Sequence, residues 1–164
     1  NKVKCLIVGY GSIGNKLKRL LFSLGIYSDE VTRYHNIEYM LSQSNYDFII
    51  NCLPLNETTK NYFNKDIFKC INPNSYFINV GRGETVNEED LYNVLKNNKI
   101  RGAFLDVVQN EPIKKSNKLL ELNNIFISPH IANASRNSLG TQIKVFTDNL
   151  IKYKNNKPLN NIII

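Results

Sequence analysis

The stretch that decides the fold is Val3-Lys4-Cys5-Leu6-Ile7-Val8-Gly9-Tyr10-Gly11-Ser12-Ile13-Gly14. Its first six residues form a short apolar run, as expected of a strand buried on both faces. Residues 12–24 then repeat their leucines with the period of a helix. Between strand and helix, the first glycine permits a tight turn, the second admits a pyrophosphate, and the third lets helix and strand pack closely.

The backbone N–H groups at the start of that helix, at Ser12 and Ile13, are expected to face the anion. The stretch Gly9–Gly14 therefore predicts a dinucleotide-binding loop. A glycine-rich turn without a ligand is the alternative interpretation of the same residues.

Apolar runs alternate with helical patterns along the rest of the chain, which indicates a parallel sheet covered by helices. Strands are expected at residues 3–8, 30–34, 48–52, 76–80, 102–107 and 125–128, helices at 12–24, 37–42, 65–71, 88–97 and 135–154, and a short turn near 117–121. The predicted fold class is α/β, a Rossmann-type doubly wound parallel sheet in a single domain over residues 1–164.

Size and composition narrow the possible classes of protein. The chain has 164 residues, 42% hydrophobic and 21% charged, which is ordinary for a globular domain with a core of its own. No apolar stretch reaches the ~18 residues of a membrane span. The net charge of +7 is scattered among Asn and Ile rather than clustered, so nucleic-acid binding is not expected. Three cysteines without metal-like spacing favour a reducing, cytoplasmic location.

The residues after the second strand bear on the choice of cofactor. NAD sites usually place an acid there, about 20 residues after the glycines, to accept hydrogen bonds from the adenosine ribose. Here the strand end offers Arg33 and His35, which would tolerate or attract a 2′-phosphate. The alternative is a ribose contact from Asp29 or Glu30. The expected cofactor is therefore NAD or NADP.

Three later blocks each place a charged or titratable residue shortly after a predicted strand: Arg82 in Asn79–Gly83, Glu111 in Asp106–Pro112, and His130 in Ser128–Ala132. The carboxyl ends of parallel strands meet at one edge of a sheet, where ligands bind. A cation, a carboxylate and an imidazole beside a nucleotide-binding loop are the parts of a hydride-transfer site.

With these motifs, in this order and spacing, the chain resembles the nucleotide-binding domain of the D-isomer-specific 2-hydroxyacid dehydrogenases. The resemblance also runs through Leu53-Pro54-Leu55-Asn56-Glu57-Thr58-Thr59 and covers essentially the whole chain. It implies interconversion of a 2-keto acid and a D-2-hydroxy acid with NAD(P)H.

The resemblance implies a role for each charged residue. Arg82 would bind the substrate carboxylate and polarise the keto oxygen through its planar fork of donors. His130 would give that oxygen a proton, and Glu111 would hold the imidazole and favour its protonated form. Further cofactor contacts are implied for Leu53, Pro54, Thr59, Val80, Gly81, Asp106 and Ala132. No metal site is expected, because His35 and His130 are the only histidines and neither has a carboxylate cluster.

The family normally carries a substrate-binding domain before the cofactor domain, and residues 135–164 resemble the segment that returns to it. The resemblance further implies a homodimer. The sequence leaves a second function open, a dinucleotide-sensing binding module without catalysis, because some members of the family act as corepressors.

Overall fold

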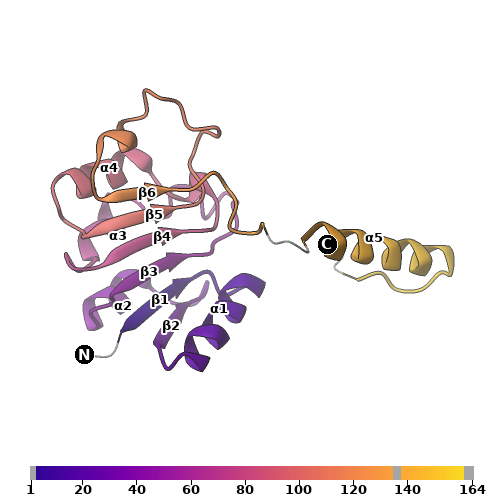
Figure 1. Cartoon of the computed structure of the whole chain (residues 1–164). Coiled ribbons are helices and arrows are strands. Elements are labelled where there is room, and N and C mark those ends of the chain that lie inside the picture. The colour runs from indigo at the N-terminus through magenta and orange to yellow at the C-terminus, as the bar shows by residue number, and fades with distance from the viewer. Residues whose placement is uncertain (1–2, 135–137, 161–164) are drawn as a thin grey trace. The chain divides into compact units, whose positions relative to one another are not determined.

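Six parallel strands form a single sheet in the computed structural model, which describes residues 3–134 and 138–160. They lie in the order β2-β1-β3-β4-β5-β6 (Figure 1). The strands are β1 (Lys4–Val8), β2 (Tyr27–Val31), β3 (Phe48–Asn51), β4 (Tyr76–Asn79), β5 (Gly102–Leu105) and β6 (Ile125–Ile127). The chain starts at β1, moves out to β2 and then crosses to β3, so the order reverses between β1 and β3, where such sheets bind ligands.

Five α-helices and two short 3-10 helices connect and follow these strands. They are α1 (Ser12–Ser23), α2 (Ile37–Gln43), α3 (Lys65–Cys70), η1 (Gly83–Thr85), α4 (Glu88–Lys96), η2 (Lys118–Glu121) and α5 (Ser138–Lys154). Asparagine side chains cap four of them, at Asn36, Asn64, Asn87 and Asn117, by accepting backbone N–H groups of the first turn. Gly25, with φ +71°, ends α1 as the sequence predicts.

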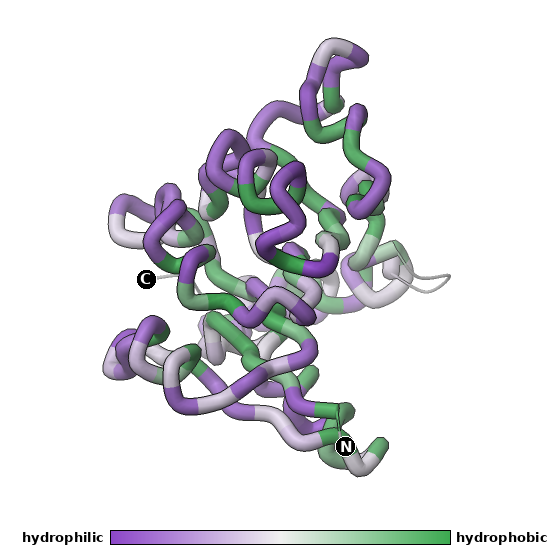
Figure 2. The backbone as a smooth tube through the Cα atoms, turned by 90° about the vertical axis from the view of Figure 1, so that its left-hand side faces the viewer, coloured by the Kyte–Doolittle hydropathy of each residue, from purple (hydrophilic) through white to green (hydrophobic). Residues whose placement is uncertain are grey.

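One face of the sheet builds the hydrophobic core against α2, α3 and α4. Alternate strand residues such as Leu6, Ile49, Phe77 and Leu105 point into it and are almost completely buried. Figure 2 shows the hydrophobic residues concentrated in the central strands and the polar ones in the outer turns and helices. This burial holds the strand ends in fixed positions.

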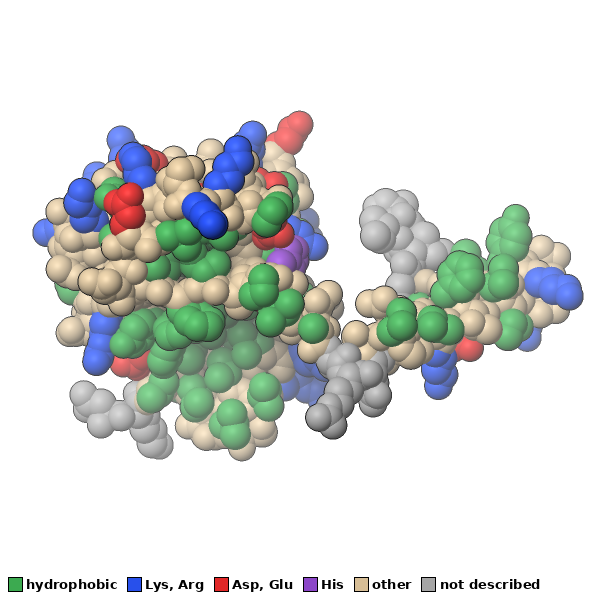
Figure 3. Space-filling view, turned by 45° about the horizontal axis from the view of Figure 1, so that its top comes forward, with side chains coloured by type: hydrophobic (Ala, Val, Ile, Leu, Met, Phe, Trp, Pro, Cys, Tyr) green, Lys and Arg blue, Asp and Glu red, His purple; other side chains and the backbone are tan. Residues whose placement is uncertain are grey.

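The other face is covered by α1 over β1 and β2, and it carries aromatic residues further along. Phe48, Tyr76, Phe104 and Phe126 contact each other in sequence across β3 to β6, with ring centroids 5.7 to 6.1 Å apart. Phe126 is 61% exposed. Hydrophobic side chains gather on the face of the molecule that Figure 3 shows.

Two boundaries differ instructively from the sequence prediction. The second strand covers Tyr27–Val31 rather than 30–34, because its register with β1 pairs Tyr27 with Lys4 and Val31 with Val8. Residues 32–35 thus form a turn at the edge of the sheet. The fifth strand likewise ends at Leu105 rather than at residue 107. The short turn expected near residues 117–121 is confirmed as the 3-10 helix η2, and the other predicted elements agree with the structure to within a few residues.

Residues 1–130 form one compact unit and residues 131–164 a second. In the second unit, the chain after α5 folds back along the helix. The side chain of Asn149 bonds the backbone of Asn160 twice, at 2.8 and 3.0 Å. The apolar residues Leu139, Ile143, Phe146, Leu150 and Ile151 of α5 are exposed within this unit. The first three residues of the helix expected at 135–154 are outside the described residues.

Candidate active site

The glycine loop has the geometry that its three glycines predict. Gly9 has φ +97°, and a Cβ there would come within 2.8 Å of the Cys52 backbone. A Cβ on Gly14 would be 2.2 Å from the Gly9 carbonyl oxygen, so α1 packs directly on the loop. A Cβ on Gly11 would meet no atom within 4 Å, which leaves open space beside the helix start for a pyrophosphate.

A cleft of about 1020 Å³ opens beside this loop, at the point where the strand order reverses. It is lined by Gly9, Tyr10, Gly11, Val31, Thr32, Arg33, Tyr34, His35, Leu53, Pro54, Asn56, Thr58, Thr59 and Tyr62. Seven of the predicted cofactor residues are in this lining. The Thr59 hydroxyl donates to the Pro54 carbonyl at 2.6 Å and holds the wall of the cleft in place. The volume of the cleft, the open space beside Gly11 and the exposed start of α1 all suit a dinucleotide.

The end of the cleft at β2 is basic. The Arg33 guanidinium is exposed and lies 5.3 Å from the centre of the Tyr34 ring. The Nδ1 of His35 accepts the Thr32 N–H at 3.1 Å, so its other ring nitrogen is left to donate. None of the residues that line the cleft is acidic.

The two acids proposed as alternative ribose partners are engaged elsewhere. Asp29 accepts hydrogen bonds from the hydroxyls of Tyr27 at 2.9 Å and Tyr46 at 2.8 Å, and it pairs with Lys4. Glu30 forms an ion pair with Lys18. Neither lines the cleft, because the register of β2 places both within the strand and only residues from 32 onward in the turn.

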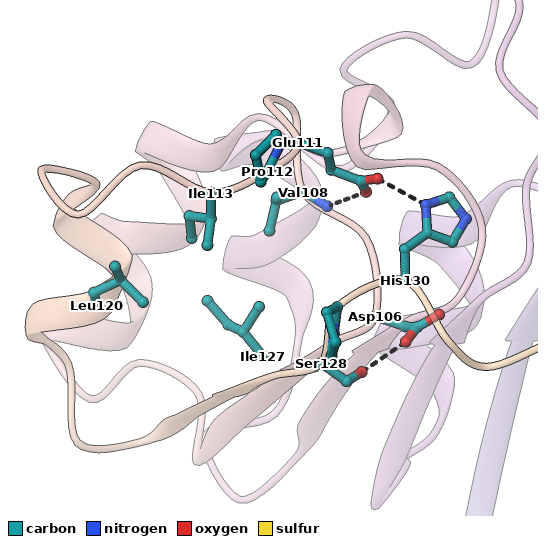
Figure 4. A pocket seen from close by; sticks show the side chains of 10 residues that line it. Asp106, Val108, Glu111, Pro112, Ile113, Leu120, Ile127, Ser128 and His130 are labelled. Atoms are coloured by element: carbon teal, nitrogen blue, oxygen red, sulfur yellow. Dashed lines mark hydrogen bonds and ion pairs between the residues drawn. The ribbon is translucent and has the colours of Figure 1, made fainter. Parts of the chain in front are cut away.

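Glu111 and His130 form a direct pair. The Glu111 Oε2 lies 2.7 Å from the His130 Nδ1, and the Glu111 Oε1 accepts the backbone N–H of Val108 at 3.2 Å (Figure 4). The pair sits at the rim of an apolar cavity of about 390 Å³ whose walls include Ile113, Leu120 and Ile127. The second ring nitrogen of His130 points away from that cavity in Figure 4. Reacting groups are therefore expected on the other side of the imidazole.

The backbone of His130 is held in an unusual conformation. Its φ is +54°, in the left-handed region that a histidine rarely adopts. Its N–H donates to the carbonyls of Asp106 at 2.9 Å and Ser128 at 3.0 Å, which stabilise this turn after β6. Such conformations persist where the surroundings impose them, and they are typical of functional sites.

Arg82 lies on the turn after β4, between two buried glycines. Its side chain is exposed, donates to the Gly81 carbonyl at 2.7 Å, and makes no ion pair within residues 3–134 and 138–160. A Cβ on Gly83 would be 2.0 Å from the carbonyl oxygen of Val108. The turn that carries Arg82 thus packs directly on the loop that bonds Glu111.

The other predicted contacts lie around this edge. Gly81 abuts the cleft wall, since a Cβ there would be 2.6 Å from the Leu53 carbonyl oxygen, and Val80 precedes it with its N–H bonded to Asn51. Ser12 and Ile13 are exposed at the start of α1. Asp106 is buried, accepts the Ser128 hydroxyl at 2.7 Å and lines the apolar cavity rather than the dinucleotide cleft. Ala132 is exposed in the second unit.

Several residues of the site are not among those predicted from the sequence. Tyr34, Asn56, Thr58 and Tyr62 line the cleft although no motif position requires them. Asn56 and Thr58 fall within the Leu53–Thr59 motif, which could have indicated them. Tyr62 comes from the following turn and reaches the cleft only through the fold.

Two of the three cysteines, Cys5 in β1 and Cys52 directly after β3, have thiols in partly or fully buried surroundings. Burial raises the pKa of both the Cys5 and the Cys52 thiol to about 11, so at neutral pH neither is a thiolate nucleophile. Cys5 is buried as predicted, and Cys52 is partly buried.

Residues 3–134 and 138–160 hold no group of three or more His, Cys, Asp or Glu suited to a metal ion. In the same residues no helix has the length and apolarity needed to span a membrane.

Comparison with known proteins places the chain among characterised relatives. It is 32% identical over 167 residues to the glyoxylate reductase/hydroxypyruvate reductase of Homo sapiens, covering 93% of this chain and 50% of that protein. It is 35% identical over 163 residues to a probable 2-ketogluconate reductase of Dictyostelium discoideum, covering 91% of this chain and 48% of the relative. The chain thus spans about half the length of these relatives.

One solved structure is similar to this chain in both its fold and its sequence. The NADPH-dependent glyoxylate/hydroxypyruvate reductase of Sinorhizobium meliloti, in complex with NADP and malonate, superposes with a TM-score of 0.82 at 30% identity, covering 93% of this chain and 50% of that one. The family model described as D-isomer specific 2-hydroxyacid dehydrogenase, NAD binding domain, matches residues 1–132. The chain therefore belongs to the D-isomer specific 2-hydroxyacid dehydrogenase family and contains its NAD-binding domain.

Proposed function

We propose that this chain provides the cofactor site and the catalytic residues of an enzyme that reversibly reduces a 2-keto acid to a D-2-hydroxy acid. The observation that carries the proposal is the 2.7 Å contact between Glu111 and His130, at the same sheet edge as the dinucleotide cleft. The names of its relatives support small substrates such as glyoxylate and hydroxypyruvate.

His130 acts as the proton donor in this proposal. Glu111 on Nδ1 fixes the ring orientation and leaves the other nitrogen to face the keto oxygen. Arg82 offers an exposed planar fork of N–H groups that suits the substrate carboxylate. The bound nicotinamide supplies the hydride, and these side chains bind, orient and protonate the keto acid.

We further propose a preference for NADPH. Arg33 and the turn at residues 32–35 form a basic end of the cleft without any acidic residue, where an adenosine 2′-phosphate would bind. Asp29 and Glu30, which would have favoured NAD, bond to other side chains. The matching Sinorhizobium reductase was solved with NADP.

Turnover is proposed to need a substrate-binding domain as well, because the relatives are about twice as long as this chain. Residues 135–164 are proposed to lead back to that domain, as the family resemblance implies. We also propose a homodimer in the cytoplasm. Light scattering of the purified protein would test the dimer, and a monomer at micromolar concentration would contradict it.

The test of function uses the full-length gene product with glyoxylate and hydroxypyruvate as substrates. His130→Ala is expected to lower kcat by about 10²- to 10⁴-fold with the Kd for NADPH unchanged. Arg82→Ala is expected to lower kcat/KM for the keto acid by about 10- to 100-fold, because it removes a charge-assisted contact.

Arg101→Ala is the matched control for Arg82. Arg101 is equally exposed but precedes β5, at the opposite edge of the sheet, where it stacks on Tyr76. Its loss should leave the kinetics unchanged. Unaltered turnover in both site variants would defeat the roles assigned to His130 and Arg82, whereas a wild-type protein that binds NADPH but reduces no 2-keto acid would favour a dinucleotide-sensing module without catalysis.

A further inference from the structure

Three buried polar side chains lie directly beneath the turn that carries Arg82. Asn51 ends β3, Asn79 ends β4, and Thr85 ends η1, and each is at most 1% exposed. Asn51 and Asn79 are register partners in neighbouring strands. Buried polar groups are costly unless they are hydrogen-bonded, so their partners are informative.

The Thr85 hydroxyl is the centre of this network. It donates its single proton to the carbonyl oxygen of Arg82 at 2.6 Å and accepts one N–H of the Asn51 side-chain amide at 2.7 Å. The other N–H of that amide reaches the side-chain oxygen of Asn79 at 2.9 Å. Each of these protons has one acceptor, so no hydroxyl or amide group donates or accepts more hydrogen bonds than its chemistry allows.

The Arg82 carbonyl oxygen receives three donors from this network. They are the Thr85 hydroxyl, the Thr85 backbone N–H at 3.2 Å and the Asn79 side-chain amide at 3.2 Å. The side-chain oxygen of Asn79 also accepts the Gly81 N–H at 3.1 Å. The backbone on both sides of the Arg82 Cα is thereby held by buried groups, while the Arg82 side chain itself is exposed.

The same network reaches the wall of the dinucleotide cleft. The side-chain oxygen of Asn51 accepts the Leu53 N–H at 3.0 Å, and Leu53 lines the cleft. The Leu53 carbonyl oxygen in turn lies against Gly81. One set of buried side chains therefore fixes the cofactor wall and the Arg82 turn relative to each other.

We infer that Thr85 is a positioning residue for the reaction, acting through the backbone of Arg82. The inference rests on the proposed function, in which Arg82 binds the substrate carboxylate. A guanidinium fork binds a carboxylate bidentately only at a defined position and angle, so a small movement of its backbone weakens that contact. The Thr85 hydroxyl prevents this movement, and Asn51 ties the position of the turn to the cofactor.

The experiment compares Thr85→Val with Thr85→Ser in the full-length gene product. Valine keeps the shape of threonine but leaves an Asn51 N–H without its acceptor and removes one donor from the Arg82 carbonyl. We expect kcat/KM for the keto acid to fall about ten-fold, mainly through KM, since a buried donor and acceptor lose a partner. The Kd for NADPH should be unchanged, because Asn51 keeps its bonds to Asn79 and Leu53. Thr85→Ser should restore the wild-type kinetics.

Ser75→Ala is the matched control for a purely structural effect. Ser75 is 1% exposed and donates to the Tyr46 carbonyl at 2.5 Å, just before the opposite end of β4. Its variant should lower the melting temperature about as much as Thr85→Val does, with unchanged KM. Equal KM effects in the two variants, or a wild-type KM in Thr85→Val, would overturn the inference.

A second readout does not depend on activity. Hydrogen exchange measured by NMR on the chain is expected to be faster in Thr85→Val at the amides of residues 81 and 85, whose acceptors belong to the network. If the wild-type protein reduced no 2-keto acid, the proposed function would fail. The exchange rates would still show whether Thr85 holds the turn, and unchanged rates would refute that role.

Discussion

At the scale of the residue, the site depends on side chains whose backbone is held by neighbours. The His130 backbone has φ +54°, and two carbonyl oxygens accept its N–H. Arg82 is exposed but has buried groups bonded on both sides of its Cα. Both side chains are exposed, while most of the groups that hold their backbone are buried, and such fixed positions limit the entropy lost on binding.

Cofactor choice is a prediction at this scale. Arg33→Ala is expected to weaken NADPH binding by about 10- to 100-fold, because a charge-assisted contact to the 2′-phosphate is lost, and to leave NADH binding unchanged. Fluorescence titration of both cofactors measures the two dissociation constants. Lys16→Ala, an exposed cation on α1 that does not line the cleft, is the control. Tighter binding of NADH than NADPH by the wild type would contradict the preference.

At the scale of the element, the register of β2 against β1 decides which residues line the cleft at the end of β2. Apolar and β-branched residues suggest a strand at 30–34, yet pairing with β1 ends the strand at Val31. Propensity is a weak guide here, because strand boundaries depend on which neighbour supplies the hydrogen bonds. The shift moves Arg33 from a strand into the turn at residues 32–35, which lines the cleft together with His35.

The glycine loop gives a paired prediction for one element. Gly14→Ala places a Cβ 2.2 Å from the Gly9 carbonyl and should destabilise the fold by about 1–3 kcal/mol through overpacking of α1 on β1. Gly11→Ala meets no atom in the structure and should leave the melting temperature unchanged, while it weakens dinucleotide binding by filling the space left for the pyrophosphate. Thermal denaturation and cofactor titration of both variants measure the two effects. A stable Gly14→Ala variant would show that the loop packs differently.

At the scale of the whole molecule, Asp29 links β2 to β1 and to the segment before β3. Burial alone would raise the pKa of this carboxyl, but hydrogen bonds from Tyr46 and Tyr27 and the charge of Lys4 outweigh burial and hold the pKa below its ordinary value. A carboxyl with a lowered pKa stabilises the fold above its unfolded pKa, and this stabilisation is lost as the pH falls through the folded pKa.

The free energy of unfolding should therefore decrease more steeply below about pH 4 in the wild type than in Asp29→Asn. Urea denaturation at several pH values between 3 and 7 measures both curves. Parallel curves for the two proteins would mean that Asp29 contributes nothing to the pH dependence.

The sequence by itself determined the class of fold, the glycine loop and the order of the three charged residues. These features are local, because strand periodicity, turn chemistry and motif spacing depend on residues that are close together in the sequence. The Asn87 cap of α4 and the end of α1 before Gly25 are local in the same way, because each depends on the side chain of one residue next to the helix. The sequence could also indicate Arg33 as a cofactor residue, but it left Asp29 and Glu30 as equal alternatives.

Only the tertiary structure shows the partners of these two acids, because those partners are distant in the sequence. Asp29 bonds Tyr46, 17 residues away, which no local pattern shows. Thr85 meets Asn51 across 34 residues, through the register of β3 with β4 and the turn that follows. Long-range pairing of strands and the burial of polar groups thus set the fine geometry of the site, whereas local periodicity sets the fold that contains it.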